Sequence, residues 1–476
     1  MSFNNVSPSV EAVKKDTFFS VLREALAGTE RDFTKGSIPL ALTILAIPMI
    51  LEMSMEALFA IVDTFFVAKL GAAAVAVVGL TESVLALVYA VAMGLSIGAT
   101  ATVSRRFGEK DFDGAARAAT HVVYLGFVVS LVMGVIGVVF AGDIYRLLGA
   151  GEDVLAIGLP FMQIMFGTSA VIVFLFLLNG IFRGVGDAAI ALRVLVVANG
   201  LNIVLDPLLI FGIAFFPEMG VTGAAVATVI GRAAGVVYAG WALFGRSIGR
   251  LQVRAEHWKL DTGLLWSISR LSGTGVLQLL VTTATWSVLV TIVAVFGSVA
   301  IAGYQIGLRI FVFLLLPVVG LANAAAALVG QNLGAGQPER AERSVWIAGG
   351  SAAAILGSLG IFFVLFSNLL VSLFTTDPEV ARYGSDCLRI IGYGYAFYGL
   401  AIVTESAFNG AGDPWTPTYI NAIVLWLIEI PLAYVLANSY DVGPQGVFWA
   451  ITISFSIWTV VAVALFKRGK WKLKVV

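Results

Sequence analysis

Residues 182–187 have the sequence Phe-Arg-Gly-Val-Gly-Asp, and residues 408–413, at an offset of 226 positions, have the sequence Phe-Asn-Gly-Ala-Gly-Asp. The same offset aligns further glycines, namely Gly71 with Gly297, Gly94 with Gly320 and Gly108 with Gly334. Single matches are common in a chain with 51 glycines, but one constant offset over much of each half is not. We therefore interpret the chain as two copies of one structural unit.

The composition places both copies in a membrane. Of the 476 residues, 59% are hydrophobic and only 12% are charged, and the mean hydropathy is +0.96. Soluble domains carry about 25% charged residues. Because lipid offers the backbone no hydrogen-bond partners, only helices and closed barrels span a bilayer, and the apolar runs here are far longer than a barrel strand of about 10 residues. The sequence predicts an all-α polytopic membrane protein.

Twelve apolar stretches are long enough to cross a hydrocarbon layer of about 30 Å. They lie near residues 38–68, 75–104, 120–141, 155–180, 189–213, 222–245, 264–295, 299–329, 345–366, 384–408, 416–437 and 446–466. Each copy holds six of them, and an even number makes the two copies parallel. We expect an N-lobe of residues 38–245 and a C-lobe of residues 264–466, as in transporters that hold substrate between parallel repeats.

Lys and Arg residues predict the orientation, because they concentrate in cytoplasmic loops. Most of the 29 basic residues lie in the N-terminal segment 1–37, the connections after even-numbered helices, the linker 246–263 and the tail 467–476. The opposite connections hold only three, Lys69, Arg146 and Arg382. We predict a multi-pass protein of the plasma (inner) membrane with both termini in the cytoplasm.

The N-terminal segment contains Phe18, Leu22 and Leu26 at helical spacing. This pattern is typical of a short amphipathic helix at the membrane surface. An irregular tail is the alternative, and the sequence leaves both open.

The first span carries three carboxylates, Glu52, Glu56 and Asp63, whose spacings of four and seven residues place them on one helical face. Ionisable residues are costly in hydrocarbon and indicate an ion or substrate pathway. Structural pairing, for example with Arg232, is the alternative for each of them.

A candidate ion site lies in the outer half of the N-lobe. The fifth span carries Asn202 and Asp206 on one face, and the sixth span places Thr228 at the same depth as Asp63 and Asp206. Glu82, on the second span, lies at a similar depth. Two carboxylates with an amide and a hydroxyl suit H⁺ or Na⁺. Our hypothesis is that ion binding at Asp63 and Asp206 is the coupling step.

The C-lobe does not repeat this site. Asp63 aligns with Leu289, and the seventh span has no acidic residue. Polar residues of the C-lobe spans, such as Gln278, Glu405 and Glu429, either take part in function or only hydrogen-bond neighbouring helices.

Six motifs follow one another in a fixed order along the chain. They are Pro48 with Val62-Asp63-Thr64, Arg183-Gly184-x-Gly186-Asp187, Asn202-x-x-x-Asp206-Pro207, Gly220-x-x-Gly223-Ala224-Ala225, Gly330-Gln331-Asn332-x-Gly334 and Asn409-Gly410-x-Gly412-Asp413. Together, over residues 38–466, they resemble the MATE (multidrug and toxic compound extrusion) transporters. The resemblance implies two six-helix lobes in a V shape. It also implies export of organic, often cationic compounds in exchange for H⁺ or Na⁺ by alternating access.

The resemblance also implies roles for individual residues. It makes Asp63, Asn202 and Asp206 the cation-binding residues of the N-lobe. It adds a threonine of the sixth helix, for which Thr228 is our choice and Thr222 the alternative.

Other positions concern the shape of the site and its departures from the family. Pro48 corresponds to the proline at which the first helix bends, and Phe59 replaces a tyrosine often found four residues before the helix 1 aspartate. Glu52 and Glu56 are additional carboxylates that could bind a cationic substrate, and Glu82 is a further accessory candidate. The absence of a helix 7 glutamate makes the protein resemble the DinF-like branch more than the NorM-like branch.

The expected function is secondary active multidrug efflux by a protein that is not an enzyme. We expect a monomer that binds small-molecule substrates and membrane lipids but no nucleic acid. Neither a cofactor nor a metal beyond Na⁺ is expected, because Cys387, His121 and His257 are too few for a convincing metal site.

Two other classes of protein compete with this expectation. A flippase for lipid-linked precursors, from the same superfamily, would need a cationic central cavity, which Arg232 and Arg309 could provide. A membrane-embedded enzyme would need a metal cluster, a nucleotide loop or a nucleophile constellation, and the sequence has none.

Overall fold

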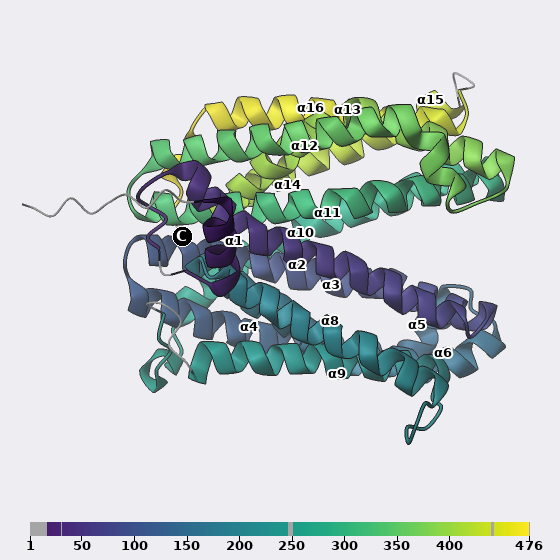
Figure 1. The fold of residues 1–476 in the computed structure, drawn as a ribbon, viewed down its shortest axis with the longest axis horizontal. Coiled ribbons are helices and arrows are strands. Elements are labelled where there is room, and N and C mark those ends of the chain that lie inside the picture. Colours follow the sequence, from purple (N-terminus) through teal and green to yellow (C-terminus); the bar gives the residue numbers. More distant parts are fainter. Residues whose placement is uncertain (1–16, 30, 246–250, 439–441, 476) are drawn as a thin grey trace, which may run out of the picture.

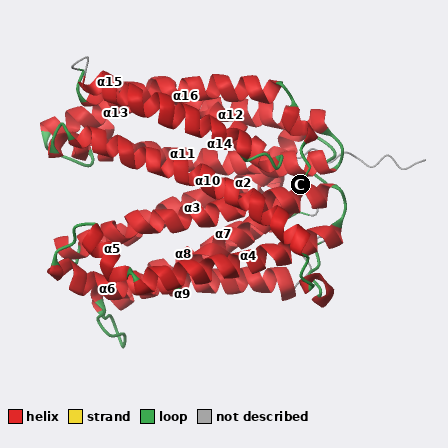
Figure 2. Ribbon diagram, turned by 180° about the vertical axis from the view of Figure 1, so that it is seen from behind, coloured by secondary structure: helices red, strands yellow, loops and turns green. Residues whose placement is uncertain are grey.

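The computed structural model describes residues 17–29, 31–245, 251–438 and 442–475, and these are almost entirely helical (Figure 1, Figure 2). The elements are α1 (Phe18–Ala27), α2 (Ile38–Ala68), α3 (Ala72–Gly108), α4 (Phe112–Val139), α5 (Ala141–Leu147), α6 (Glu152–Gly167), α7 (Ser169–Val185), α8 (Ala188–Phe211), α9 (Gly220–Gly240), η1 (Trp241–Gly245), η2 (Ala255–Trp258), α10 (Thr262–Ala294), α11 (Ser298–Gly334), α12 (Pro338–Ser372), α13 (Pro378–Gly410), α14 (Trp415–Asn421), η3 (Ala422–Glu429), α15 (Ile430–Asn438), α16 (Pro444–Lys467) and η4 (Lys470–Leu473). The all-α fold predicted from the composition is confirmed. Four of the basic residues that predict the orientation lie outside the described residues, namely Lys14, Lys15, Arg246 and Arg250.

Twelve membrane spans result if the bent pair α6 and α7 counts as one. Eleven other spans, each long and apolar enough to cross a bilayer, are found in the described residues. The predicted span 155–180 is not one straight helix, since α6 and α7 meet at Thr168 with a bend of 40°. The run Gly167-Thr168-Ser169 has low helix propensity, and the Thr168 hydroxyl donates to the carbonyl of Ile164 at 2.7 Å, a bond that often bends helices.

Most helices extend beyond the apolar runs that predicted them. For example, α12 covers residues 338–372 rather than 345–366, because helix caps rather than the edges of hydrocarbon set the ends. The Asp261 side chain caps α10 by accepting from the backbone N–H groups of Gly263 and Leu264 at 2.9 and 3.0 Å. These hydrogen bonds lower the pKa of the Asp261 carboxyl, and the bond from Leu264 has the larger effect of the two.

The internal repeat is visible in the longest helices. α3 and α11 have 37 residues each, and each begins directly after a glycine with a positive φ, 98° at Gly71 and 95° at Gly297. Both helices end at the aligned glycines Gly108 and Gly334. Only glycine adopts this backbone conformation readily, which explains why the repeat is clearest at glycine positions.

The two lobes meet at the end of the molecule that carries α1 and η4, and they diverge toward the other end (Figure 1, Figure 2). At the contact, glycines bring the backbones together. A Cβ at Gly94 would lie 2.4 Å from the backbone nitrogen of Val276, and a Cβ at Gly108 would lie 2.1 Å from the carbonyl oxygen of Gln331. Small residues permit this close approach, so the fold has the V shape implied by the family resemblance.

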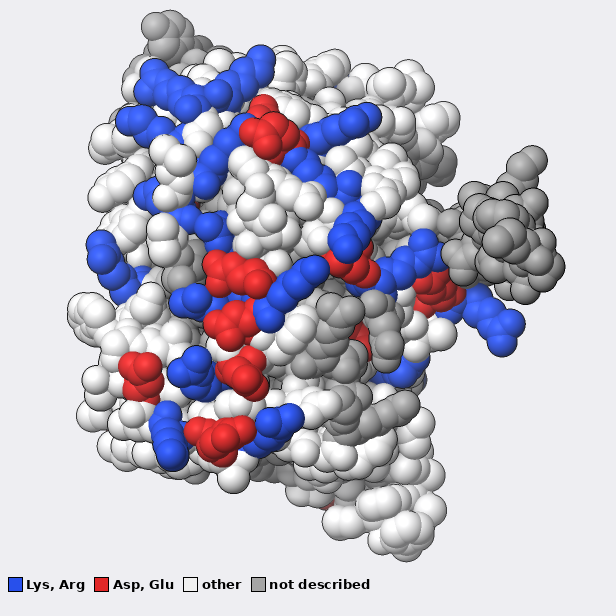
Figure 3. Space-filling model, turned by 90° about the vertical axis from the view of Figure 1, so that its left-hand side faces the viewer, with Lys and Arg blue, Asp and Glu red and all other residues white. Residues whose placement is uncertain are grey.

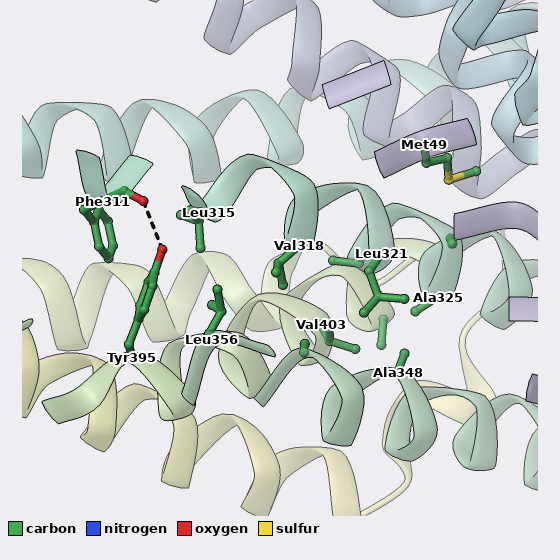
Figure 4. Packing of buried hydrophobic residues seen from close by; sticks show 14 of the residues in the cluster. Met49, Phe311, Leu315, Val318, Leu321, Ala325, Ala348, Leu356, Tyr395 and Val403 are labelled. Carbon is green, nitrogen blue, oxygen red and sulfur yellow. Dashed lines mark hydrogen bonds between the residues drawn. The ribbon is translucent and has the colours of Figure 1, made fainter. Parts of the chain in front are cut away.

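Each lobe has its own apolar core, but α2 contributes to both. Its first part, through Met49, belongs to the core of the C-lobe, which extends to Tyr395, whose hydroxyl donates to the carbonyl of Phe311 at 3.0 Å (Figure 4). Farther along α2, Val67 belongs to the N-lobe core, against which Met55 packs. Helix α2 therefore crosses from one lobe to the other, and Pro48 lies at the crossing.

Lys and Arg side chains gather on the end where the lobes meet (Figure 3). There the Arg340 guanidinium of α12 donates to the carbonyl oxygens of Phe33, Lys35 and Gly36 at 3.1, 2.9 and 2.8 Å. These bonds tie the chain before α2 to the C-lobe. Helix α1 begins at Phe18, so the helical alternative for residues 18–27 is the one that the structure contains.

Candidate functional site

Asp206, Asn202 and Thr228 form a buried polar cluster between α8 and α9. The Asn202 amide donates to Asp206 Oδ1 at 3.1 Å and to Thr228 Oγ1 at 3.3 Å. The three side chains are 0, 1 and 5% exposed, respectively. The alternative threonine, Thr222, makes no hydrogen bond to this cluster among the described residues. Three of the four predicted cation-binding residues are thus brought into direct contact.

Glycines of α9 allow the two helices to approach this closely. A Cβ at Gly231 would lie 2.5 Å from the carbonyl oxygen of Ala198 and 3.1 Å from the Asn202 side chain. At Gly223 it would lie 2.5 Å from the carbonyl oxygen of Leu209. Gly223 and Gly231 therefore place no side chain against α8, and the Thr228 hydroxyl, between them along α9, reaches Asn202.

The cluster has unused capacity to bind a cation. Asp206 Oδ2 and Asn202 Oδ1 are buried and accept no hydrogen bond. An unsatisfied buried acceptor costs about 1–3 kcal/mol. Pro207, inside α8, lacks an N–H group and leaves the helix carbonyl of Ile203 without its usual donor. All of these are oxygen ligands, which H⁺ and Na⁺ both accept.

Asp63 approaches the cluster from α2. It is partly exposed and makes no hydrogen bond or ion pair with any described residue. Its charge interacts with that of Asp206, and also with those of Glu82 and Arg232. Asp63 is therefore the one carboxylate of this region that is both near Asp206 and without a bonded partner.

Glu56 and Arg232 form a buried ion pair beside the cluster. Glu56 Oε2 lies 3.6 Å from Arg232 Nη2, and the Arg232 side chain is 3% exposed. The guanidinium also lies over two aromatic rings, at 4.9 Å from the centroid of Phe59 and 5.3 Å from that of Tyr89. For Glu56 the structure thus contains the structural pairing that the sequence left open. Phe59 contacts this arginine, and Tyr89 is a further contact that no sequence motif predicts.

Glu52 pairs with a base in the last turn of α7. Its Oε1 lies 3.5 Å from Arg183 Nη1 and accepts from the amide of Asn179 at 3.1 Å. Arg183 in turn donates to Ser96 Oγ at 2.9 Å. Arg183 flanks the connection after α7, because it lies in the last turn of that helix, but its side chain is buried in the N-lobe against α2.

Glu82 lies across from the C-lobe. It is exposed on α3, and its charge interacts with that of Arg309 on α11, yet the two side chains form no ion pair among the described residues. Because α3 and α11 belong to different lobes, this interaction depends on how far apart the lobes stand.

Pro48 is buried within α2, which continues as a helix on both sides of it. At the next residue, the carbonyl oxygen of Met49 would lie 2.5 Å from a Cβ at Gly320 of α11. Pro48 therefore weakens α2 where the helix leaves the C-lobe, since a proline removes one helical hydrogen bond.

The C-lobe has a polar network of different composition. The Gln278 amide donates to Glu405 Oε1, and the Asn421 amide donates to the same oxygen at 3.3 Å. Trp458 Nε1 donates to Asn421 Oδ1 at 2.6 Å. Within this network the one carboxylate, Glu405, has two donors. Trp458 is a member that the sequence did not indicate.

A fold of two parallel helical lobes, with a polar cluster buried in one of them, is typical of a secondary transporter. Comparison with known proteins is more specific. A family model described as MatE matches residues 48–208 and 275–435, at nearly the offset of the predicted repeat. The chain belongs to the MATE family, whose members are transporters and not enzymes.

Individual relatives agree with this assignment. The chain is 28% identical over 399 residues to "FAD transporter" of Shewanella oneidensis, with 83% of this chain and 87% of that protein covered. It is 27% identical to "Probable multidrug resistance protein NorM" of Thermotoga maritima, with 91% and 93% covered. A solved structure titled "Outward-facing conformation of a multidrug resistance MATE family transporter of the MOP superfamily" is 25% identical with a TM-score of 0.87, covering 93% of this chain and 98% of that one.

Proposed function

We propose that this protein exports organic, amphiphilic or cationic compounds in exchange for H⁺ or Na⁺. Membership of the MATE family supports multidrug efflux, as do relatives with multidrug resistance names. The observation that carries the coupling is the buried Asp206–Asn202–Thr228 cluster with its two unpartnered oxygens.

The coupling cycle follows from the electrostatics of the two aspartates. Asp63 and Asp206 repel one another when both are charged in a site of low dielectric. Binding of one cation removes this repulsion and supplies the missing partner of Asp206. Ion binding thereby draws Asp63, and with it the outer part of α2, toward α8.

Movement of α2 connects the ion site to the lobes. The helix packs in the C-lobe before Pro48 and in the N-lobe after it. A displacement at Asp63 therefore changes the angle between two lobes, which we take as residues 38–245 and 264–466, joined by the linker 246–263. Glu52 and Glu56 have an accessory role in this scheme, because they neutralise Arg183 and Arg232.

Orientation and branch are part of the same proposal. Basic side chains on the end that carries α1 and η4 support cytoplasmic termini (Figure 3). Placement in the DinF-like branch is supported by α10, which has no acidic residue and offers Gln278 to Glu405.

The flippase alternative is not favoured. It requires a cationic central cavity, whereas Arg232 is paired with Glu56 and the charge of Arg309 interacts with that of Glu82. Each candidate base thus interacts with a carboxylate, Arg232 through an ion pair and Arg309 at longer range.

The test is efflux from proteoliposomes driven either by a pH gradient or by a Na⁺ gradient, each imposed alone. Ethidium and FAD serve as transported compounds, the latter because a relative carries that name. Asp206→Asn and Asp63→Asn should each slow ion-driven efflux about 10- to 100-fold, the loss expected when a charged binding group is removed. Glu218→Gln, an exposed carboxylate outside the site, should have no effect. Unchanged ion-driven efflux in both aspartate variants would contradict the proposal, and the gradient that drives transport identifies the ion.

A further inference from the structure

A cavity of about 280 Å³ lies on the C-lobe, between η3 with the preceding helix α14 and the facing side of α16. Its walls are mainly aliphatic, with Ile423, Val424 and Ile428 on one side and Ile457, Val461 and Leu465 on the other. Arg468 and Lys470 line it at one end only. The cavity is therefore apolar along its length and basic at its mouth.

The length of the cavity matches one leaflet of a bilayer. Along α16 it extends from Ile457 to Arg468, roughly 16 Å at 1.5 Å per residue. One leaflet contributes about half of a hydrocarbon layer that is about 30 Å thick. The volume is slightly below the range of about 300–1,000 Å³ found for drug-sized ligands. A narrow, extended chain fits these dimensions better than a bulky polycyclic compound.

The two bases at the mouth are available to an external anion. Arg468 and Lys470 are exposed and form no ion pair among the described residues. The acidic residue of the lining, Asp413, is already paired, since Lys474 Nζ lies 3.0 Å from its Oδ1 and the Thr416 hydroxyl donates to its Oδ2 at 2.7 Å. The uncompensated charge at this end is thus positive.

One wall of the cavity has an unusual helix geometry. Residues 422–429 form a π-helix, a wider turn that occurs frequently at functional sites. Trp415 and Tyr419 stack with ring centroids 5.4 Å apart near the same end, as is typical of the interface between membrane and water. The basic mouth therefore lies at the level of lipid headgroups.

We propose that this cavity binds one acyl chain of an anionic phospholipid, whose headgroup phosphate contacts Arg468 and Lys470. Basic pockets between membrane helices on the cytoplasmic side bind such headgroups. The bound lipid joins α14 to the C-terminal tail, whose Trp471 is buried and donates to the carbonyl of Phe466 at 2.9 Å. With cytoplasmic termini, as proposed above, the lipid belongs to the inner leaflet.

The test measures lipid retention on the full chain by native mass spectrometry, with titration of phosphatidylglycerol and, separately, phosphatidylcholine of the same chains. The double variant Arg468→Gln and Lys470→Gln should raise the dissociation constant of the anionic lipid roughly 30-fold. Val461→Trp should abolish tight binding of either lipid by filling the cavity. The double variant Lys110→Gln and Lys259→Gln removes two exposed bases elsewhere and should leave binding unchanged.

Several results would overturn the proposal. They are equal affinity for the two lipids, retention unaffected by both cavity variants, and an equal loss of retention in the control variant. Displacement of the lipid by ethidium at concentrations that saturate efflux would also overturn it, since the cavity would then belong to the substrate pathway. Efflux assays on the same variants keep this test separate from the proposed function. A variant that loses lipid binding but keeps ion-driven efflux concerns the cavity alone and leaves the proposed function unaffected.

Discussion

Gly108 and Gly334, which the repeat aligns, hold the lobes together where α3 and α11 cross. A Cβ at Gly334 would lie 2.2 Å from the carbonyl oxygen of Arg105, and one at Gly108 would lie 2.1 Å from the carbonyl oxygen of Gln331. Real Cβ atoms essentially never come this close to backbone. Gly334→Ala therefore cannot be accommodated without separating the lobes at this end.

The size of the effect follows from where the clash occurs. Overpacking typically costs about 1–3 kcal/mol. The contact at Gly334 joins the two lobes, so this cost falls on the state in which the lobes touch here and not on the state in which they separate. A difference of about 1–3 kcal/mol changes the ratio of the two states roughly 5- to 150-fold. We expect Gly334→Ala to shift the protein strongly toward the conformation closed at the opposite end.

Distances between spin labels on the far end of the two lobes measure this shift. Phe215 in the N-lobe and Leu373 in the C-lobe are 86% and 74% exposed there, and each can be replaced by cysteine for labelling. The one native cysteine, Cys387, is buried and can be changed to serine. In Gly334→Ala the ratio of molecules with the shorter distance to molecules with the longer distance should increase roughly 5- to 150-fold.

Gly273→Ala is the matched control, because this helical glycine of α10 has no atom within 4 Å of its Cβ position. It adds the same methyl group without a clash, and its distance distribution should equal that of the parent protein. If Gly334→Ala also leaves the distribution unchanged while the protein remains folded, the contact at Gly334 does not set the conformational equilibrium.

Three further predictions concern charged groups. Arg183→Met leaves Glu52 buried without its base and should lower the free energy of unfolding by about 3–5 kcal/mol, measured by thermal unfolding in detergent. Adding Glu52→Gln to this variant should recover most of the lost stability. Arg340→Gln removes hydrogen bonds to residues 33–36 and should speed hydrogen exchange at the start of α2, by an amount that corresponds to about 1.5–3 kcal/mol. The carboxylate of Asp261 has a lowered pKa, so its cap on α10 is intact near neutral pH and weakens as the pH falls through that pKa. Hydrogen exchange in the first turn of α10 should show this pH dependence, whereas exchange in the Asp261→Asn variant should not.

The architecture could be predicted because it depends on features that the sequence displays directly. Long apolar runs report the spans, and the constant offset reports the repeat, down to Gly71 and Gly297 with their matching positive φ. The bend at Thr168 was not predicted, since no proline marks it and an apolar run continues through it.

Part of the site could also be predicted from helical periodicity. Asn202 and Asp206 are four residues apart on α8, which places them on one face before any tertiary contact is known. That Thr228 rather than Thr222 reaches Asn202 depends on the close packing of α9 at Gly231, which single-sequence periodicity does not contain.

Partners of the charged residues were harder to predict, because a sequence does not state which helices adjoin. The sequence offers Arg232 as a structural partner for the helix 1 carboxylates, and in the structure it pairs with Glu56. Arg183 follows an apolar run in the sequence, yet its side chain is buried and pairs with Glu52. Long side chains near helix ends can extend along the helix, so position in the chain is a poor guide to the depth of their charges.

These pairings distinguish the three carboxylates on one face of α2. Glu52 has Arg183 and Glu56 has Arg232, so each charge is compensated whatever ion is bound. Asp63 has no such bonded partner among the described residues, and its charge interacts with that of a second carboxylate, Asp206. The electrostatic free energy of a charged Asp63 would therefore change when the proposed ion binds. A ligand shifts a conformational equilibrium only through a difference in binding between the two states. In the coupling that we propose, Asp63 is thus the one of the three carboxylates at which a bound ion would act on α2, whereas Glu52 and Glu56 keep their ion pairs in both states.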